Sequence, residues 1–328
     1  MQAKEVLQLV RDCCDNFLKR EEAKHALDFI DVNTSRIPEK EADFDYYREI
    51  TQYLVSRGKL REWLCVLQQD GLSFTAAWVQ KIDELQQSIE FSQKLDQWSL
   101  PRTVLTYHDG QKQHKIFLIA KTRVGFGKAK KSQNPDVDIT MRVLPLRSQE
   151  LDPGNWARTK KISQHHGNFV LRNNQFYVER LGKNGIFTLE GNEIEKESLF
   201  TLKDTMQIRL AQESLQLKLT TIRDLETQNV NCLCVERVDN HVHHCYVQVI
   251  REVTIGGKKA DVNLPGMNGA FRIVTAQEGW NVIPDESGYT KINSEVIQEP
   301  TLLCNRDVLS TGQQEIVFCM TEDNDFIE

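Results

Sequence analysis

The segment KKISQHHGNFVLRNNQFYVERLGKNGIFTLEG, residues 160–191, decides the fold that the sequence predicts. Two consecutive runs in it place apolar side chains at every second position: Phe169 and Leu171, then Phe176 and Val178. Such alternation is typical of β-strands with one buried face. Asn173-Asn174 between the runs suits a hairpin turn, because asparagine tolerates positive φ angles. The turn residues 182–185 then end the second run before Ile186 begins a third strand.

The first 97 residues have a helical pattern instead. Apolar residues recur at steps of three and four, as an amphipathic helix requires. We expect helices near 6–18, 23–30, 41–57 and 60–67, and a last one from Ser73 to about residue 91. Gly58 is placed to cap the third helix in the left-handed conformation. These short helices predict a compact bundle of four or five members.

The remaining chain predicts β structure that occurs twice. Runs at 102–107 and 115–120 surround Asp109-Gly110, which is a hairpin signal. Residues 230–320 repeat this order, with a hairpin at 232–249 and a glycine-lysine step at 256–258 that matches Gly127-Lys128. The polar stretch 149–159 is expected to be a loop that overhangs Ser163. Residues 220–231 form either a stiff connector or a hinge between the two copies.

Composition restricts the functional classes. The chain has 328 residues, 40% hydrophobic and 27% charged, which fits an ordinary globular protein. A formal net charge of -6 argues against binding to nucleic acid or to anionic membranes, since both favour basic proteins. No apolar run is long enough to span a bilayer, and the N-terminus does not resemble a secretion signal. Eight cysteines without a disulfide-like spacing indicate free thiols in a reducing, cytoplasmic setting.

Several ordered motifs over residues 101–222 resemble the forkhead-associated (FHA) domain. In chain order they are Phe126-Gly127-Lys128, Asp136-Val137-Asp138-Ile139, Ser163-Gln164-His165-His166 followed by Gly167, Asn184-Gly185, and 202–208. The resemblance implies a β-sandwich whose apical loops bind phosphothreonine peptides, one of the acidic-motif recognition modes.

The resemblance also implies a phosphopeptide-binding site. Lys128 would supply positive charge, Ser163 a hydroxyl donor, and Asn184 a hydrogen bond to the backbone of the ligand. Gln164 stands where a second cation is common, and its neutral amide is a weaker donor to phosphate. Lysine at 128 replaces the family's arginine and loses the planar fork that holds two phosphate oxygens.

Two further residues of this region, His166 and Gly185, are expected to structure the loops rather than touch the ligand. Basic neighbours could strengthen the positive field, or could equally be a solvated surface: Lys130, Lys131, Arg158, Lys160 and Lys161. The alternative is a retained fold that binds an unmodified protein partner.

The second copy, from residue 226 to 328, resembles a degenerate FHA domain. Residues 269–272 are not preceded by a Ser-x-x-His block, 289–293 lack the Asn-Gly turn, and Gly257 stands in place of the pocket cation. We therefore expect this copy to pack or dock rather than to bind phosphate. The predicted domains are 1–97, a helical adaptor; 98–225, the more complete FHA-like sandwich; and 226–328, the degenerate one.

Neither a metal site nor an enzymatic site is predicted. Cysteines and histidines gather at 232–245, but the paired Cys-x-x-Cys spacing of structural zinc sites is missing, and buried thiols explain them equally well. No nucleophile elbow, zinc-protease helix or phosphate-binding loop occurs. The expected protein is not an enzyme and needs no cofactor.

The helical region carries one weaker similarity. Residues 47–67 resemble bacterial effector-associated adaptor domains of death-like type, although a plain bundle with aromatic core residues fits equally. Together these features predict a signalling adaptor with a phosphothreonine-containing or unmodified protein partner, and a possible death-like helical partner. The alternative is a phosphate-independent scaffold whose helical domain makes homotypic contacts with an effector.

Overall fold

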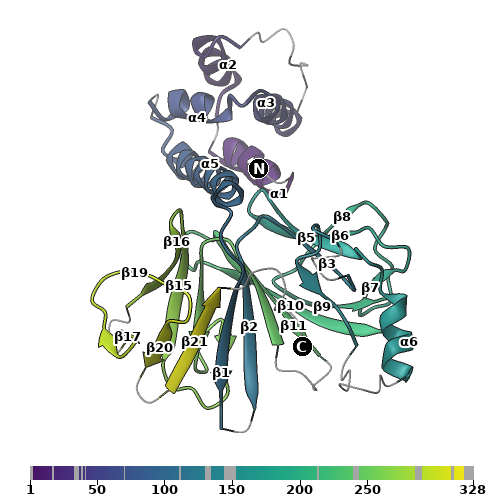
Figure 1. Ribbon diagram of the computed structural model, residues 1–328. Helices are drawn as coiled ribbons and strands as arrows, with labels where there is room; N and C mark the ends of the chain where they lie inside the picture. Colours follow the sequence, from purple (N-terminus) through teal and green to yellow (C-terminus); the bar gives the residue numbers. More distant parts are fainter. Residues whose placement is uncertain are drawn as a thin grey trace. The chain divides into compact units, whose positions relative to one another are not determined.

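The computed structural model describes residues 3–16, 18–32, 37, 40, 42–69, 71–110, 112–129, 134–143, 153–212, 214–238, 244–284, 290–311 and 314–320. The chain divides into two compact units, Met1–Glu90 and Phe91–Glu328. The first is helical and the second is mostly β structure with several sheets (Figure 1). Within the described residues, no helix combines the length and apolar character needed to cross a membrane.

The helices of the first unit follow the predicted pattern. Their bounds are α1 Ala3–Asp15, α2 Arg20–Phe29, α3 Asp43–Arg57, α4 Leu60–Gln69 and α5 Phe74–Trp98. Gly58 ends α3 with φ 68°, as expected for a left-handed cap. The indole of Trp63 is buried and donates to the carbonyl of Ala23 at 3.2 Å. The apolar stripes of these helices therefore form one core.

Helix α5 is longer than the sequence pattern predicted. The expectation that the helix would end near residue 91 is wrong, because α5 continues to Trp98. Phe91, Leu95 and Trp98 lie at helical spacing and pack against the core of the β unit, where Leu95 is fully buried. The polar residues 92–94 occupy the turn between these contacts, so they do not interrupt the apolar face.

The β unit contains two sets of strands. The bounds of the first set are β1 Thr103–His108, β2 Gln113–Ile119, β3 Arg123–Gly127, β4 Ile139–Thr140, β5 Gly167–Arg172, β6 Gln175–Arg180, β7 Ile186–Thr188, β8 Leu199–Thr201, β9 Thr205–Leu210 and β10 Leu215–Arg223. The bounds of the second are β11 Val230–Arg237, β12 His244–Val249, β13 Glu252–Gly256, β14 Val262–Asn263, β15 Ala270–Ala276, β16 Gly279–Ile283, β17 Thr290–Ile292, β18 Glu295–Val296, β19 Thr301–Leu302, β20 Val308–Thr311 and β21 Gln314–Met320.

The predicted hairpin around Asn173-Asn174 is confirmed. Strands β5 and β6 pair antiparallel with Phe169 opposite Val178 and Leu171 opposite Phe176. Asn173 and Asn174 have φ values of 49° and 56° and form the turn.

Each set contributes one five-stranded sheet, and the two sheets have the same strand order. The first sheet runs β4-β3-β5-β6-β8 and the second runs β14-β13-β15-β16-β19. In both, the short second strand pairs parallel with the strand before it, β3 with β4 and β13 with β14. This shared order is what the predicted internal repeat requires.

A third sheet of eleven strands joins both sets, in the order β18-β17-β20-β21-β1-β2-β12-β11-β10-β9-β7. Its two halves meet where β2 pairs parallel with β12. The hairpins are exchanged between the halves: β1–β2 lies beside β21 of the second set, and β11–β12 lies beside β10 of the first. Figure 1 shows β1 next to the yellow β21 at the far end of the sequence.

The short connection between β10 and β11 explains this exchange. Only the turn at 224–229 separates the two strands, and Asp224 accepts from the backbone N–H of Thr227 at 2.8 Å and of Glu226 at 3.1 Å. Strands joined by so short a turn pair antiparallel with each other. Residues 220–231 are thus parts of two paired strands and their turn in one continuous sheet. The predicted division at 225/226 stays a prediction.

A carboxylate fixes the same turn in both sets, but with different partners. Asp138 is buried, bonded to Arg102 at 2.7 Å and to Lys121 at 2.8 Å, and it accepts from the backbone N–H of Gly125 at 3.1 Å. Burial acts to raise the pKa of Asp138, but Lys121 and Arg102 outweigh burial, so the pKa lies below its ordinary value. Asp261 instead accepts from the backbone and hydroxyl of Thr254, both at 2.8 Å.

One predicted loop is a helix. Residues 149–159 were expected to form a loop, but α6 occupies Pro153–Lys161. Proline is favourable in the first turn of a helix, where its missing N–H leaves no hydrogen bond unmade. The Asp-Pro-Gly signal therefore marks the start of a helix here.

Candidate functional site

Three segments of the first set converge at one end of the five-stranded sheet β4-β3-β5-β6-β8. The backbone N–H of Lys128 donates to the carbonyl of Ser163 at 3.0 Å, and that of Ala129 donates to Gln164 at 3.2 Å. These bonds join the end of β3 to the segment before β5. We call Lys128, Ser163, Gln164 and Asn184, with their segments, the first loop cluster.

A glycine allows the third segment to approach. A Cβ atom at Gly182 would lie 2.5 Å from Oγ of Ser163 and 2.9 Å from Nδ1 of His166. Any larger residue would push the turn away from both side chains. The Gly-Lys-Asn-Gly turn is therefore held against Ser163, and it carries Asn184 to the same end of the sheet.

The two main donors of the predicted site are bound to the end of α6. Nζ of Lys128 donates to the carbonyl of Lys160 at 3.0 Å, and Nδ2 of Asn184 donates to the carbonyl of Lys161. Carbonyls in the last turn of a helix have no intrahelical partner and carry partial negative charge. Lys128 and Asn184 thus stabilise the C-terminus of α6.

His166 is fully buried and organises the loop before β5. Its Nδ1 accepts from the backbone N–H of Ser163 at 3.1 Å, and its carbonyl accepts from Leu181 and Gly182 at 3.0 and 2.9 Å. Burial lowers the pKa of His166 to about 4, helped by the charge of Arg180 and opposed by the backbone of Gly185. The ring is therefore neutral at neutral pH, and it supplies no charge for an anion.

Gly185 lies in a close-packed part of the turn. A Cβ atom there would lie 2.5 Å from the ring of Phe187 and 2.7 Å from the carboxylate of Glu193. The carbonyl of Gly185 accepts from Ala211 at 2.9 Å, which ties the turn to the residue after β9.

Arg180, which the sequence pattern did not single out, holds the same turn. Its guanidinium donates to the carbonyls of Lys183 at 3.1 Å and Ile194 at 3.0 Å, and it forms an ion pair with Glu193 at 2.6 Å. The sequence signal that could have identified it is an arginine at the end of a predicted strand, just before a glycine-rich turn. Since Arg180 bonds to the protein itself, its role is to position the turn.

No metal centre is found among the described residues. All eight cysteines are free thiols, and no group of three His, Cys, Asp or Glu side chains in the described segments is arranged to hold an ion. Cys232 and Cys234 are buried on one face of β11. His241 and His243 of the considered cluster lie outside the described residues.

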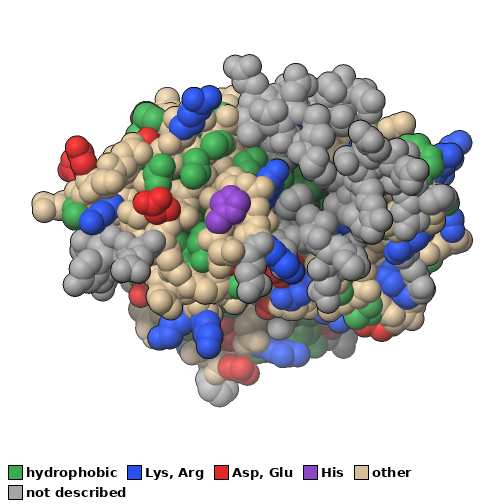
Figure 2. Space-filling view, turned by 60° about the horizontal axis from the view of Figure 1, so that its bottom comes forward, with side chains coloured by type: hydrophobic (Ala, Val, Ile, Leu, Met, Phe, Trp, Pro, Cys, Tyr) green, Lys and Arg blue, Asp and Glu red, His purple; other side chains and the backbone are tan. Residues whose placement is uncertain are grey.

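The charge on the surface is divided. On the face shown in Figure 2, Lys and Arg side chains of the described residues lie at separate points, with Asp and Glu between them. A continuous basic face, as nucleic acid would favour, is not what this view displays.

Comparisons with known proteins identify no relative of this chain. No protein-family model matches the chain, and neither a curated protein nor a solved structure matches it.

Proposed function

We propose that this protein is a non-enzymatic interaction protein whose β unit binds a partner without requiring phosphorylation. One observation carries this proposal. Phosphate and ligand binding would depend on the side-chain donors of Lys128 and Asn184. Both donors are already hydrogen-bonded to carbonyls of α6. A phosphate would have to replace these bonds before it could be held.

The proposal includes two FHA-like β-sandwiches in tandem. The equal order of the two five-stranded sheets, and their shared continuation into the large sheet, support it. In each half, two sheets that face each other would bury the apolar side chains of β5 and β15. The sandwiches exchange their first hairpins, so they act as one scaffold rather than as two separate modules.

A second candidate is the phosphothreonine reader. The observation in its favour is that Lys128, Ser163 and Asn184 come from three segments that meet at one end of a sheet. In this case α6 would have to withdraw and release the side chains of Lys128 and Asn184. The hydroxyl of Ser163 would then complete the site.

The helical unit is proposed to make protein contacts of the death-like type, and the whole chain to act in the cytoplasm. Phe29 at the end of α2 is 71% exposed, which is unusual for a phenylalanine and offers an anchor for a helical partner. The free thiols favour a reducing compartment.

The deciding experiment is a titration of the full chain with a phosphothreonine peptide library and its unphosphorylated counterpart. We expect no peptide whose binding depends on phosphate, and no difference among wild type, Lys128→Ala and Ser163→Ala. Lys203→Ala, an exposed lysine outside the first loop cluster, is the matched control. Phosphate-dependent binding that Lys128→Ala abolishes and Lys203→Ala retains would establish the reader instead.

A further inference from the structure

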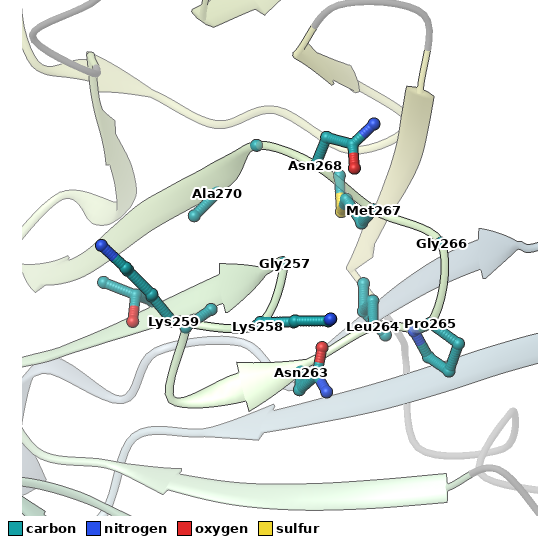
Figure 3. A pocket seen from close by; sticks show the side chains of 13 residues that line it. Gly257, Lys258, Lys259, Asn263, Leu264, Pro265, Gly266, Met267, Asn268 and Ala270 are labelled. Atoms are coloured by element: carbon teal, nitrogen blue, oxygen red, sulfur yellow. The ribbon is translucent and has the colours of Figure 1, made fainter.

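The second set of strands carries an open hollow at the position that α6 fills in the first. Its volume is about 730 Å³, and it lies between the turn after β13 and the segment that connects β14 to β15 (Figure 3). We call residues 257–260 and 263–270 the second loop cluster. The connection is short here, from Leu264 to Gly269, whereas Met141 to His166 make the corresponding connection of the first set.

The walls of this hollow are fixed by hydrogen bonds. The N–H of Gly257 donates to the carbonyl of Gly269 at 2.9 Å, which ties the two segments together. The side chain of Gln314 accepts from the N–H of Asn268 at 2.9 Å and donates to Gly266. The hydroxyl of Tyr107 donates to the carbonyl of Pro265 at 3.1 Å. A ligand would therefore meet a largely preformed site, which lowers the entropic cost of binding.

The described lining of the hollow carries positive charge without a counter-charge. Lys258 and Lys259 are exposed, and the described residues that line the hollow include no Asp or Glu. Neither ammonium group has an ion pair or hydrogen bond with another described residue, in contrast to Lys128. The nearby carboxylate of Asp261 is already bonded to Thr254. In Figure 3 the side chain of Lys258 extends toward the Leu264–Pro265 side of the hollow.

The other groups of the lining favour a peptide. Asn263 and Asn268 present exposed amides, which can donate to and accept from a peptide backbone, while Leu264 and Met267 line the hollow from the buried core. A hollow of this size is within the range of typical ligand sites.

A carboxylate fits the lining better than a phosphate group does. The N–H groups of Gly257, Ala260, Leu264, Met267 and Asn268 all donate within the protein. These five backbone donors are therefore engaged within the protein, whereas two flexible ammonium groups suit separate carboxylates.

We propose that the second loop cluster binds the acidic side chains of an extended, unmodified peptide segment in a partner protein. This inference rests on the proposed function and names its partner class. Lys258 and Lys259 pair with the carboxylates, and Asn263 and Asn268 bond to the backbone of the segment. Because the lysines are exposed, the attraction is weakened by salt.

The test is fluorescence polarisation of the full chain with a labelled Gly-Glu-Gly-Glu-Gly-Glu peptide. We expect saturable binding that weakens at least tenfold in the double variant Lys258→Glu/Lys259→Glu and falls as sodium chloride is raised. The control Lys112→Glu/Lys203→Glu changes two other exposed lysines by the same charge, and should stay within twofold of wild type. Equal melting temperatures of the three proteins exclude a folding defect.

Three results would overturn the inference: no binding of the acidic peptide at millimolar concentration, equal weakening by both double variants, or binding only when a phosphothreonine replaces the glutamates. The proposed function itself fails through a different result, phosphate-dependent binding that requires Lys128. Failure at the second loop cluster alone leaves the phosphate-independent scaffold in place.

Discussion

The first and second loop clusters stand at the same end of sheets with the same strand order, yet their lysines do different things. In the first, Lys128 and Asn184 bond to the C-terminal carbonyls of α6. In the second, no helix is inserted, and Lys258 and Lys259 are exposed around a hollow. One inserted helix therefore decides whether the polar groups at this end of a sheet stabilise the protein or remain available to a ligand.

The largest expected difference in stability between the two sets of strands comes from Asp138 and Asp261, the carboxylates at matching turns. Asp138→Ala leaves buried Arg102 without its carboxylate and should lower the free energy of unfolding by about 3–5 kcal/mol. Asp261→Ala removes hydrogen bonds to Thr254 alone and should cost about 1–2 kcal/mol. Urea denaturation of both variants measures this difference, and equal losses would show that the two turns are equivalent.

Helix α6 can be broken to make the first loop cluster resemble the second. Ala157 is an exposed residue in the interior of α6, and Ala157→Pro should destabilise the protein by about 3 kcal/mol. Ala157→Gly is the control, with an expected loss of about 1 kcal/mol. Calorimetric unfolding gives both values. A proline variant as stable as wild type would mean that α6 contributes little to the first loop cluster.

The first loop cluster should also be sensitive to pH, because the second set has no histidine in place of His166. The folded protein lowers the pKa of His166 from 6.5 to about 4, so the neutral ring stabilises the fold above pH 6.5. As the pH falls from 6.5 to 4 the unfolded chain gains a proton that the folded chain does not, and up to about 3 kcal/mol of stability is lost. Urea midpoints of wild type and His166→Gln at pH 7 and pH 4.5 measure this. A loss of the same size in His166→Gln would assign the effect to other groups.

The smallest expected effect on stability comes from replacing Lys128 or Lys258. Lys128→Met removes the hydrogen bond to Lys160 and should lower the free energy of unfolding by about 1 kcal/mol. Lys258→Met changes an exposed side chain and should stay within about 0.5 kcal/mol of wild type. Thermal melts at one pH are sufficient. The reverse order would indicate that Lys258 has a structural role.

The site was predictable in part. The sequence identified the turn around Asn184 and the block around Ser163, and the structure joins this block to Lys128 and holds the turn against Ser163. It did not indicate that α6 would bond to Lys128 and Asn184, because the Asp-Pro-Gly signal fits the start of a loop and of a helix equally. Arg180 was missed for a related reason: its carbonyl partners become neighbours only after the turn has folded.

The amino-acid pattern specifies local structure. Alternating apolar residues specified strands such as β5 and β6, asparagines at 173 and 174 specified their turn, and Gly58 specified the end of α3. Tertiary structure alone decided which hairpin completes which half of the large sheet. The β1–β2 and β11–β12 hairpins have similar patterns of apolar residues. Such alternation indicates which face of a strand is buried, but it does not indicate which neighbouring strand supplies the hydrogen bonds. The short turn at 224–229 placed β11 beside β10, and β1 then paired with β21.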